Sequence, residues 1–267
     1  MGLQLHGAFN FRDPGTVETA DGMRVKRGRI YRSGNLSILR PAGLERLAAL
    51  GIRLVIDFRT EAERSARPNR LPQGCPIREE HLPVSFVPEL ERTWSPWDQL
   101  RFVASGRIRR FDAQFVTEAY SALPQRAADA LRALFRLLLD PANYPLVMLC
   151  SGGRDRTGFA SALVLHALGV PFDAILNEYV LTNASVGPAM ERRIRILRLL
   201  SGFRVSMASL RAFLEARPEY LRAAFESMEQ TVGSTEKYLG VSDKERAVLQ
   251  SLLLESVSAQ AASCAGE

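Results

Sequence analysis

A glycine-containing loop, Cys150 to Gly158, lies between an apolar run and a helical pattern, and five residues separate its cysteine from Arg156. The apolar run at 144–149 predicts a short buried strand, and the pattern at 158–168 predicts a helix. A loop between a strand and a helix N-terminus directs backbone N–H groups at one point, where the helix dipole favours an anion. The sequence therefore predicts an anion-binding loop in an α/β fold.

The residue types of this loop suit the binding and transfer of a phosphoryl group. Helix N-termini and neighbouring arginines stabilise thiolates, so we expect Cys150 to be the nucleophile. The planar guanidinium of Arg156 matches two phosphate oxygens and stays charged. We expect the other phosphate-binding residues to be Ser151, Gly152, Gly153, Arg154, Asp155 and Thr157.

The loop resembles the Cys-x-x-Gly-Lys-Asp-Arg-Thr-Gly signature of bacterial tyrosine/serine and lipid phosphatases, which are atypical members of the protein-tyrosine phosphatase superfamily. Four more segments match this family in the expected order, so the resemblance covers nearly the whole chain. They are the segments at 10–13, 31–34, 55–60 and 238–241. The resemblance implies hydrolysis of phosphomonoesters through a cysteinyl phosphate, without a cofactor.

The chain differs from the family pattern at two positions. Leu149 stands where the family usually has a histidine that orders the loop and helps to ionise the cysteine. We expect this difference to affect the rate more than the class of reaction. Arg154 replaces the usual lysine, which keeps the charge but exchanges a compact ammonium for a wider guanidinium.

Hydrolysis of a phosphate ester needs an acid for the leaving oxygen, and three aspartates compete for this role. Asp57 lies at the carboxyl end of a predicted parallel strand, and it matches the aspartate that the resemblance implicates. Asp155 lies inside the loop, where it can protonate the leaving group or orient the neighbouring arginines. Asp98 follows a Trp-Ser-Pro-Trp segment that is similar to the acid loop of conventional tyrosine phosphatases, but the order of its residues differs.

Strands alternate with helical patterns through the first half of the chain, which predicts a mainly parallel twisted sheet flanked by helices. The expected strands are a hairpin at 19–25, then 30–32, 53–58, 77–84 and 144–149. The expected helices are 41–50, 99–123, 125–139 and 158–168, followed in a helix-rich C-terminal half by 172–183, 188–200, 218–230, 234–239 and 242–254. We expect one phosphatase domain at 1–255 and a flexible tail at 256–267. The segment at 94–123 has an apolar side and is either a helical lid over the site or an ordinary core helix.

Composition favours a single enzyme without a metal or cofactor. The three cysteines, at 75, 150 and 264, and the three histidines have no metal-ligand spacing. No apolar run approaches the length of about 20 residues that a membrane span needs. The first ten residues lack the pattern of a secretory signal, so we expect a cytoplasmic protein.

Basic residues exceed acidic ones, with 35 Lys and Arg against 29 Asp and Glu. The basic clusters at 24–29, 107–110 and 192–198 are typical of solvated faces, but a cluster beside the pocket would attract acidic, phosphorylated substrates or an anionic membrane. We expect phosphorylated proteins or phosphoinositides as partners. Aromatic residues do not alternate with the basic runs, which argues against nucleic acid.

Two other functions stay open on the sequence. A catalytically weak or inactive phosphate-binding module would keep the loop and bind phosphorylated partners without turnover. A thiol enzyme such as an arsenate reductase or sulfurtransferase would also need an anion-binding loop, but it would need a resolving thiol such as Cys75 or a sulfur donor as well.

Overall fold

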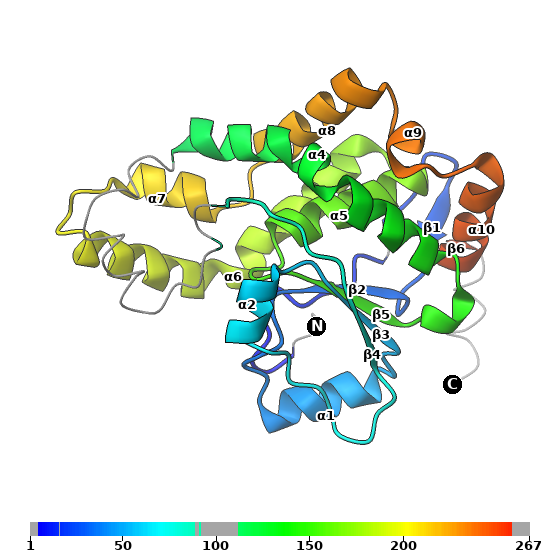
Figure 1. Cartoon of the computed structure of the whole chain (residues 1–267), viewed down its shortest axis with the longest axis horizontal. Coiled ribbons are helices and arrows are strands. Elements are labelled where there is room, and N and C mark those ends of the chain that lie inside the picture. The colour runs from blue at the N-terminus through cyan, green and yellow to red at the C-terminus, as the bar shows by residue number, and fades with distance from the viewer. Residues whose placement is uncertain (1–4, 16, 89–90, 92–111, 258–267) are drawn as a thin grey trace.

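Four parallel strands form the central sheet of the protein in a computed structural model (Figure 1). Their order across the sheet is β2 (Ile30–Ser33), β5 (Leu146–Leu149), β3 (Leu54–Asp57) and β4 (Arg78–His81). The structure describes residues 5–15, 17–88, 91 and 112–257. The predicted parallel sheet is confirmed, because each neighbouring pair in it runs parallel.

Helices cover both faces of this sheet, and β2, β5 and β3 are fully buried, whereas the edge strand β4 is partly exposed. The flanking helices are α1 (Pro41–Ala49), α4 (Ala113–Leu138) and α5 (Asp155–Ala167). Val55 and Val147 belong to the hydrophobic core that contains Leu47 of α1. The alternate residues Ile56 and Met148 belong to the larger core, which contains α4 and α5. Figure 1 shows α1 on one side of the sheet and these two helices on the other.

Helix α4 continues through Pro124, although the sequence predicts separate helices at 99–123 and 125–139. Proline removes one helical hydrogen bond, which is why a break was expected there. Pro124 is buried, and its carbonyl accepts a hydrogen bond from Tyr238 Oη at 2.7 Å. Contacts of α4 with α8 (Pro218–Val232) and α9 (Thr235–Leu239) outweigh the local preference.

The expected lid at 94–123 divides into two parts. Residues 94–111 lie outside the described residues. The part at 113–123 belongs to α4, and its Val116, Tyr120 and Leu123 are buried in the larger core. The described part of this segment is therefore a core helix.

Helices fill the C-terminal half, as predicted. Helix α6 (Phe172–Leu200) is a single helix where two, at 172–183 and 188–200, were expected. Helix α10 (Asp243–Leu253) follows α8 and α9. Helix α7 (Met207–Leu214) was not predicted, although Ser206 accepts from the N–H of Ser209 at 3.0 Å in the usual manner of an N-cap. A 3₁₀ turn, η2 (Pro141–Asn143), precedes β5.

A second, antiparallel sheet joins the two ends of the described chain. It pairs β1 (Met23–Val25) with β6 (Leu254–Ser256). Ser256, the first residue of the expected flexible tail, pairs with Met23. Residues 258–267 lie outside the described part. The predicted hairpin near residue 22 is confirmed by the antiparallel bridge between Glu18 and Arg24.

Three strands of the parallel sheet end in register at one edge. Leu149 of β5 lies between Ser33 of β2 and Asp57 of β3. The segments that follow these residues therefore emerge side by side, at the edge where α/β sheets form their ligand sites. Among the described residues, no helix has the length and apolar character needed to span a membrane.

Candidate active site

A cavity of about 590 Å³ opens beside this edge of the sheet. Three groups of residues line it: residues from the loop after β5, charged residues from α2 (Glu61–Ala66) and the segments around it, and apolar residues from the segment after β4 and from α6 and α7. The loop residues are Ser151, Gly152, Arg154, Asp155 and Arg156; the apolar ones include Phe86, Val87, Met190, Ile196, Leu197, Phe213 and Leu214. Its size suits a small organic ligand.

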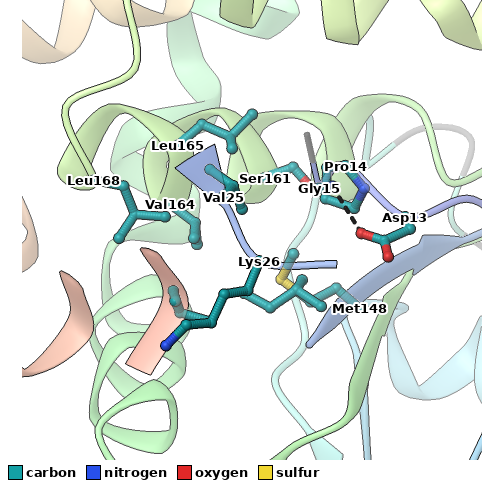
Figure 2. Close-up of a pocket in the computed structure, with 12 residues that line it drawn as sticks. Asp13, Pro14, Gly15, Val25, Lys26, Met148, Ser161, Val164, Leu165 and Leu168 are labelled. Carbon is teal, nitrogen blue, oxygen red and sulfur yellow. Dashed lines mark hydrogen bonds between the residues drawn. The ribbon is translucent and has the colours of Figure 1, made fainter. Parts of the chain in front are cut away.

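Another cavity lies behind β5, between β1 and α5 (Figure 2). Its volume is about 10 Å³, the space of roughly one water molecule. Ser161, Val164 and Leu165 of α5 line it together with Asp13, whose carboxylate accepts from the N–H of Gly15. This cavity is too small for a substrate, so the larger one is the candidate active site.

The phosphate loop, Cys150 to Arg156, joins the central strand β5 to α5. Cys150 follows the last residue of β5 and is buried, with 2% of its surface exposed. Asp155 and Arg156 already belong to the first turn of α5. The loop therefore lies where the N–H groups and the positive end of the helix dipole favour an anion.

Glu63 of α2 holds the guanidinium of Arg156 through two hydrogen bonds. Nη1 donates to Oε2 at 2.6 Å, and Nη2 donates to Oε1 at 2.8 Å. Nη1 also donates to the carbonyl of Val84 at 3.2 Å. Nη2 also donates to Ser151 Oγ at a longer distance of 3.4 Å, and Nε has no acceptor among the described residues, so Nε and Nη2 form the side of the guanidinium that a ligand could approach. Ser151 donates a hydrogen bond from Oγ to the same carboxylate.

The contact lowers the pKa of Glu63 and raises the pKa of Arg156. Burial alone would raise the pKa of Glu63. The hydrogen bond and the charge of Arg156 outweigh this effect, with smaller contributions from Ser151 and the backbone of Thr60, and they lower the Glu63 pKa to about 2. Burial likewise opposes the charge of Arg156, but Glu63 and the charge of Cys150 raise its pKa. Both groups are therefore ionised at neutral pH.

Asp155 is held from two sides at the wall of the cavity. Arg154 donates to its carboxylate from Nε at 2.8 Å and from Nη2 at 3.1 Å. Tyr120 of α4 donates from Oη at 2.7 Å, and this hydroxyl also shares a hydrogen bond with Tyr179 of α6 at 2.6 Å. Burial, followed by the charge of Asp155, raises the pKa of both tyrosines, so they stay protonated.

Asp57 lies deeper, at the end of β3, with only 1% of its surface exposed. Its carboxylate accepts from Arg59 Nε and Nη2, the latter at 2.6 Å, and from Asn69 Nδ2 at 3.1 Å. Arg59 in turn donates from Nη1 to the carbonyl of Arg67 at 2.7 Å. Asp57 thus ties the end of β3 to the chain just after α2, and it does not line the cavity.

The cavity wall also carries two arginines without a carboxylate partner among the described residues. Its carboxylates are engaged: Glu63 with Arg156, Asp155 with Arg154, and Glu91 with the N–H of Val87 at 3.0 Å. The side chains of Arg67 and Arg192 have no acceptor within the described part of the chain. Arg192 begins the basic cluster at 192–198, so one of the predicted clusters borders the pocket.

The structure brings most of the predicted loop residues together, but not all of them into the cavity. Cys150, Gly153 and Thr157 are not among the residues that line it, and Thr157 is fully buried, with a hydroxyl that has no partner among the described residues. Asp98 lies outside the described residues. No group of three or more histidine, cysteine or carboxylate side chains that would hold a metal occurs within the described ranges.

Sequence reasoning missed two contributors to the site. Glu63 was not predicted as a site residue, although Thr60 and Glu63 form a capping box at the start of α2 and match its sequence signature. That signature predicts α2 and places Glu63 one turn from the sheet edge. Tyr120 gave no such signal, because its contact with Asp155 joins residues 35 positions apart.

A loop that follows the central strand and leads into a helix N-terminus is suited to bind an anion, and comparisons with known proteins identify the family of the chain. The model of the tyrosine phosphatase family matches residues 3–255. A putative tyrosine-protein phosphatase of Cupriavidus necator is 33% identical over 235 residues, which are 86% of this chain and 80% of that protein. The triple specificity protein phosphatase PtpB of Mycobacterium tuberculosis is 33% identical over 261 residues, 88% of this chain and 92% of that protein.

The chain therefore belongs to the tyrosine phosphatase family and is a phosphatase. These findings do not favour the alternative of a non-catalytic phosphate-binding module. The crystal structure of P. aeruginosa TpbA is also similar, with a TM-score of 0.31 and 18% identity, over 73% of this chain and 98% of that one. A likeness of this size carries no argument.

Proposed function

We propose that this phosphatase hydrolyses phosphotyrosyl esters through a cysteinyl phosphate on Cys150. The thiolate gives its electron pair to phosphorus while the bond to the leaving oxygen breaks, and that oxygen takes a proton from Asp155. Water then attacks the phosphocysteine, Asp155 takes the proton of this water, and phosphate leaves. The cavity lined by loop residues 151, 152 and 154–156 is the observation that supports this proposal most directly.

In this proposal Arg156 stabilises the transferring phosphoryl group with Nε and Nη2. Glu63 occupies the other side of the guanidinium, so the orientation of the arginine is fixed before substrate binds. A donor that is held in place does not have to reorganise during the reaction, which is the main source of electrostatic catalysis.

Asp155, rather than Asp57, is the proposed acid. Asp155 lines the cavity, and its side chain is 18% exposed. Asp57 is almost fully buried and does not line the cavity, whereas hydrogen bonds to both carboxylate oxygens are common to the two aspartates. We therefore assign Asp57 a positioning role: it holds the sheet edge and α2 in place and does not contact the substrate.

The proposed substrates are acidic phosphotyrosyl proteins. The apolar wall that includes Phe86, Val87 and Phe213 suits an aryl ring, and Arg67 and Arg192, which have no ion pair within the described structure, suit an acidic neighbour. A relative is named a triple specificity phosphatase, so phosphoserine, phosphothreonine and phosphoinositides belong to the proposal as further substrates. Contact of the basic cluster at 192–198 with anionic membranes, and a cytoplasmic location, are part of the same proposal.

Leaving-group dependence tests the proposed acid. We expect Asp155→Asn to lower kcat for phenyl phosphate and a phosphotyrosyl peptide about 10²- to 10³-fold, but kcat for 6,8-difluoro-4-methylumbelliferyl phosphate much less, because that leaving group needs no proton. Asp57→Asn should lower the rates for all three substrates by a similar factor. The assignment is wrong if Asp57→Asn, and not Asp155→Asn, shows the selective loss.

A further inference from the structure

Two sequence motifs near the N-terminus have no part in the reaction described so far. They are the segments at 10–13 and 31–34, and both reach the phosphate loop. Arg32 donates from Nη2 to the carbonyl oxygen of Gly153 at 2.9 Å, and Asn10 donates from Nδ2 to the same oxygen at 2.7 Å. Arg32 is completely buried and Asn10 nearly so. One carbonyl of the loop is therefore held by two buried donors from outside the loop.

A second loop carbonyl is held in the same way. Asn35, just after β2, donates to the carbonyl of Ser151 from Nδ2 at 3.0 Å and from its backbone N–H at 3.3 Å. In a trans peptide the C=O and the following N–H point in opposite directions. A carbonyl held on the β2 side therefore turns the N–H groups of Gly152 and Arg154 away from β2, toward the interior of the loop.

The backbone at Gly153 leaves little freedom. Its φ is +65°, a conformation that glycine adopts readily. A Cβ atom at this position would lie 2.4 Å from the carbonyl carbon of Ser33, so the loop packs directly against the end of β2. If the peptide between Gly153 and Arg154 turned over, a carbonyl oxygen would replace an N–H donor and repel a bound anion.

The two donors are themselves held by a buried charge network. Glu178 of α6 accepts from Arg32 Nη1 at 2.6 Å and from Arg12 Nε at 2.7 Å. Burial opposes the charge of Glu178, but the charges of Arg32 and Arg12 outweigh it and lower its pKa. Arg12 also donates to Asn10 Oδ1 and to Thr182 Oγ1, the latter at 3.1 Å. Arg12 makes no contact with the phosphate loop in these hydrogen bonds.

We infer that Arg32 and Asn10 are positioning residues of the phosphate loop. They hold the Gly153 carbonyl outward, so that the N–H of Arg154 stays directed at the phosphoryl group. The inference rests on the proposed function of this loop but concerns anion binding, which can be measured without turnover.

Arg12 provides a control for Arg32, because it pairs with the same carboxylate of Glu178 but donates to Asn10 Oδ1 and not to Gly153, so that Arg12→Met leaves both donors to the Gly153 carbonyl in place. We would measure the Kd of tungstate by calorimetry for the wild type and for Arg32→Met, Asn10→Gly and Arg12→Met, with the melting temperature of each. We expect about tenfold or weaker binding in Arg32→Met and Asn10→Gly, and less than threefold change in Arg12→Met at a comparable loss of thermal stability.

A second readout follows the backbone directly. In ¹⁵N-resolved spectra the amide of Arg154 should shift on tungstate binding in the wild type and in Arg12→Met, and shift far less in the other two variants. If Arg32→Met does not fold, Asn10→Gly still tests the inference, since glycine tolerates the φ of +57° at position 10. Equal losses of affinity in Arg32→Met and Arg12→Met, or an unchanged Arg154 shift in Asn10→Gly, would overturn the inference. If the wild type itself does not bind tungstate, the proposed function of the loop fails, and the inference fails with it.

Discussion

At the scale of single residues, the contact between Glu63 and Arg156 fixes the orientation in which the guanidinium would bind the phosphoryl group. Glu63→Gln keeps the shape of the side chain but removes the charge and turns an amide NH₂ toward the guanidinium. We expect kcat/KM for p-nitrophenyl phosphate to fall about 10- to 100-fold, because a misplaced Arg156 guanidinium stabilises the transition state less well. Glu61→Gln, on the exposed side of the same helix, is the control and should retain nearly full activity.

The same contact predicts how stability depends on pH. The Glu63 pKa is about 2 in the folded protein, against an ordinary value of 4.5. A lowered carboxyl pKa stabilises the fold above the unfolded value, and the effect is lost as the pH falls through the folded one. Between pH 7 and pH 3, urea unfolding should therefore show the wild type losing about 2 kcal/mol relative to Glu63→Gln. A difference that does not change over this range would contradict the pairing.

At the scale of helices, a close approach of α5 to α6 limits what the loop's own helix can accept. A Cβ atom on Gly158 would lie 2.9 Å from Cε2 of Tyr179 and 3.2 Å from Nη2 of Arg32. Alanine is the better helix former, but this crowding should make Gly158→Ala destabilising by about 1–3 kcal/mol in thermal or urea unfolding. Ser161→Ala, also buried in α5 and without a partner for its hydroxyl within the described structure, should be close to neutral. A stabilised Gly158→Ala would show that the two helices can separate at little cost.

The sequence predicted those elements whose stabilising contacts are local. The strand before Cys150 and the helix after it could be predicted because apolar periodicity and Gly169 mark them. The break expected at Pro124 is wrong, because contacts with α8 and α9 keep α4 continuous. Such long-range contacts cannot be predicted from the local hydrophobic pattern. For the same reason the sequence identified Asp155 but not Tyr120, which reaches it from another helix.

At the scale of the whole molecule, the excess of positive charge should act on substrate binding. The formal net charge is +6, and Arg67 and Arg192 place two positive charges on the cavity wall. We expect kcat/KM for a phosphotyrosyl peptide with flanking glutamates to fall as salt rises, mainly through KM, because screening weakens the attraction. Arg67→Gln and Arg192→Gln should each weaken this dependence.

Two controls make the charge test specific. Lys244→Gln removes the same charge from α10, at the end of the molecule opposite α2 and α7 in Figure 1, and should behave like the wild type. A peptide with glutamines in place of the glutamates should show little salt dependence. If Lys244→Gln and Arg192→Gln have the same effect, the attraction comes from net charge and not from the cavity wall.

The central claim is that Cys150 carries the phosphoryl group, and one comparison tests it most directly. Hydrolysis of p-nitrophenyl phosphate would be measured for the wild type and Cys150→Ser, with tungstate binding to both. We predict turnover by the wild type, none by Cys150→Ser, and anion binding by both. Turnover that survives in Cys150→Ser, or a wild type that binds the anion without hydrolysing the ester, would contradict the account.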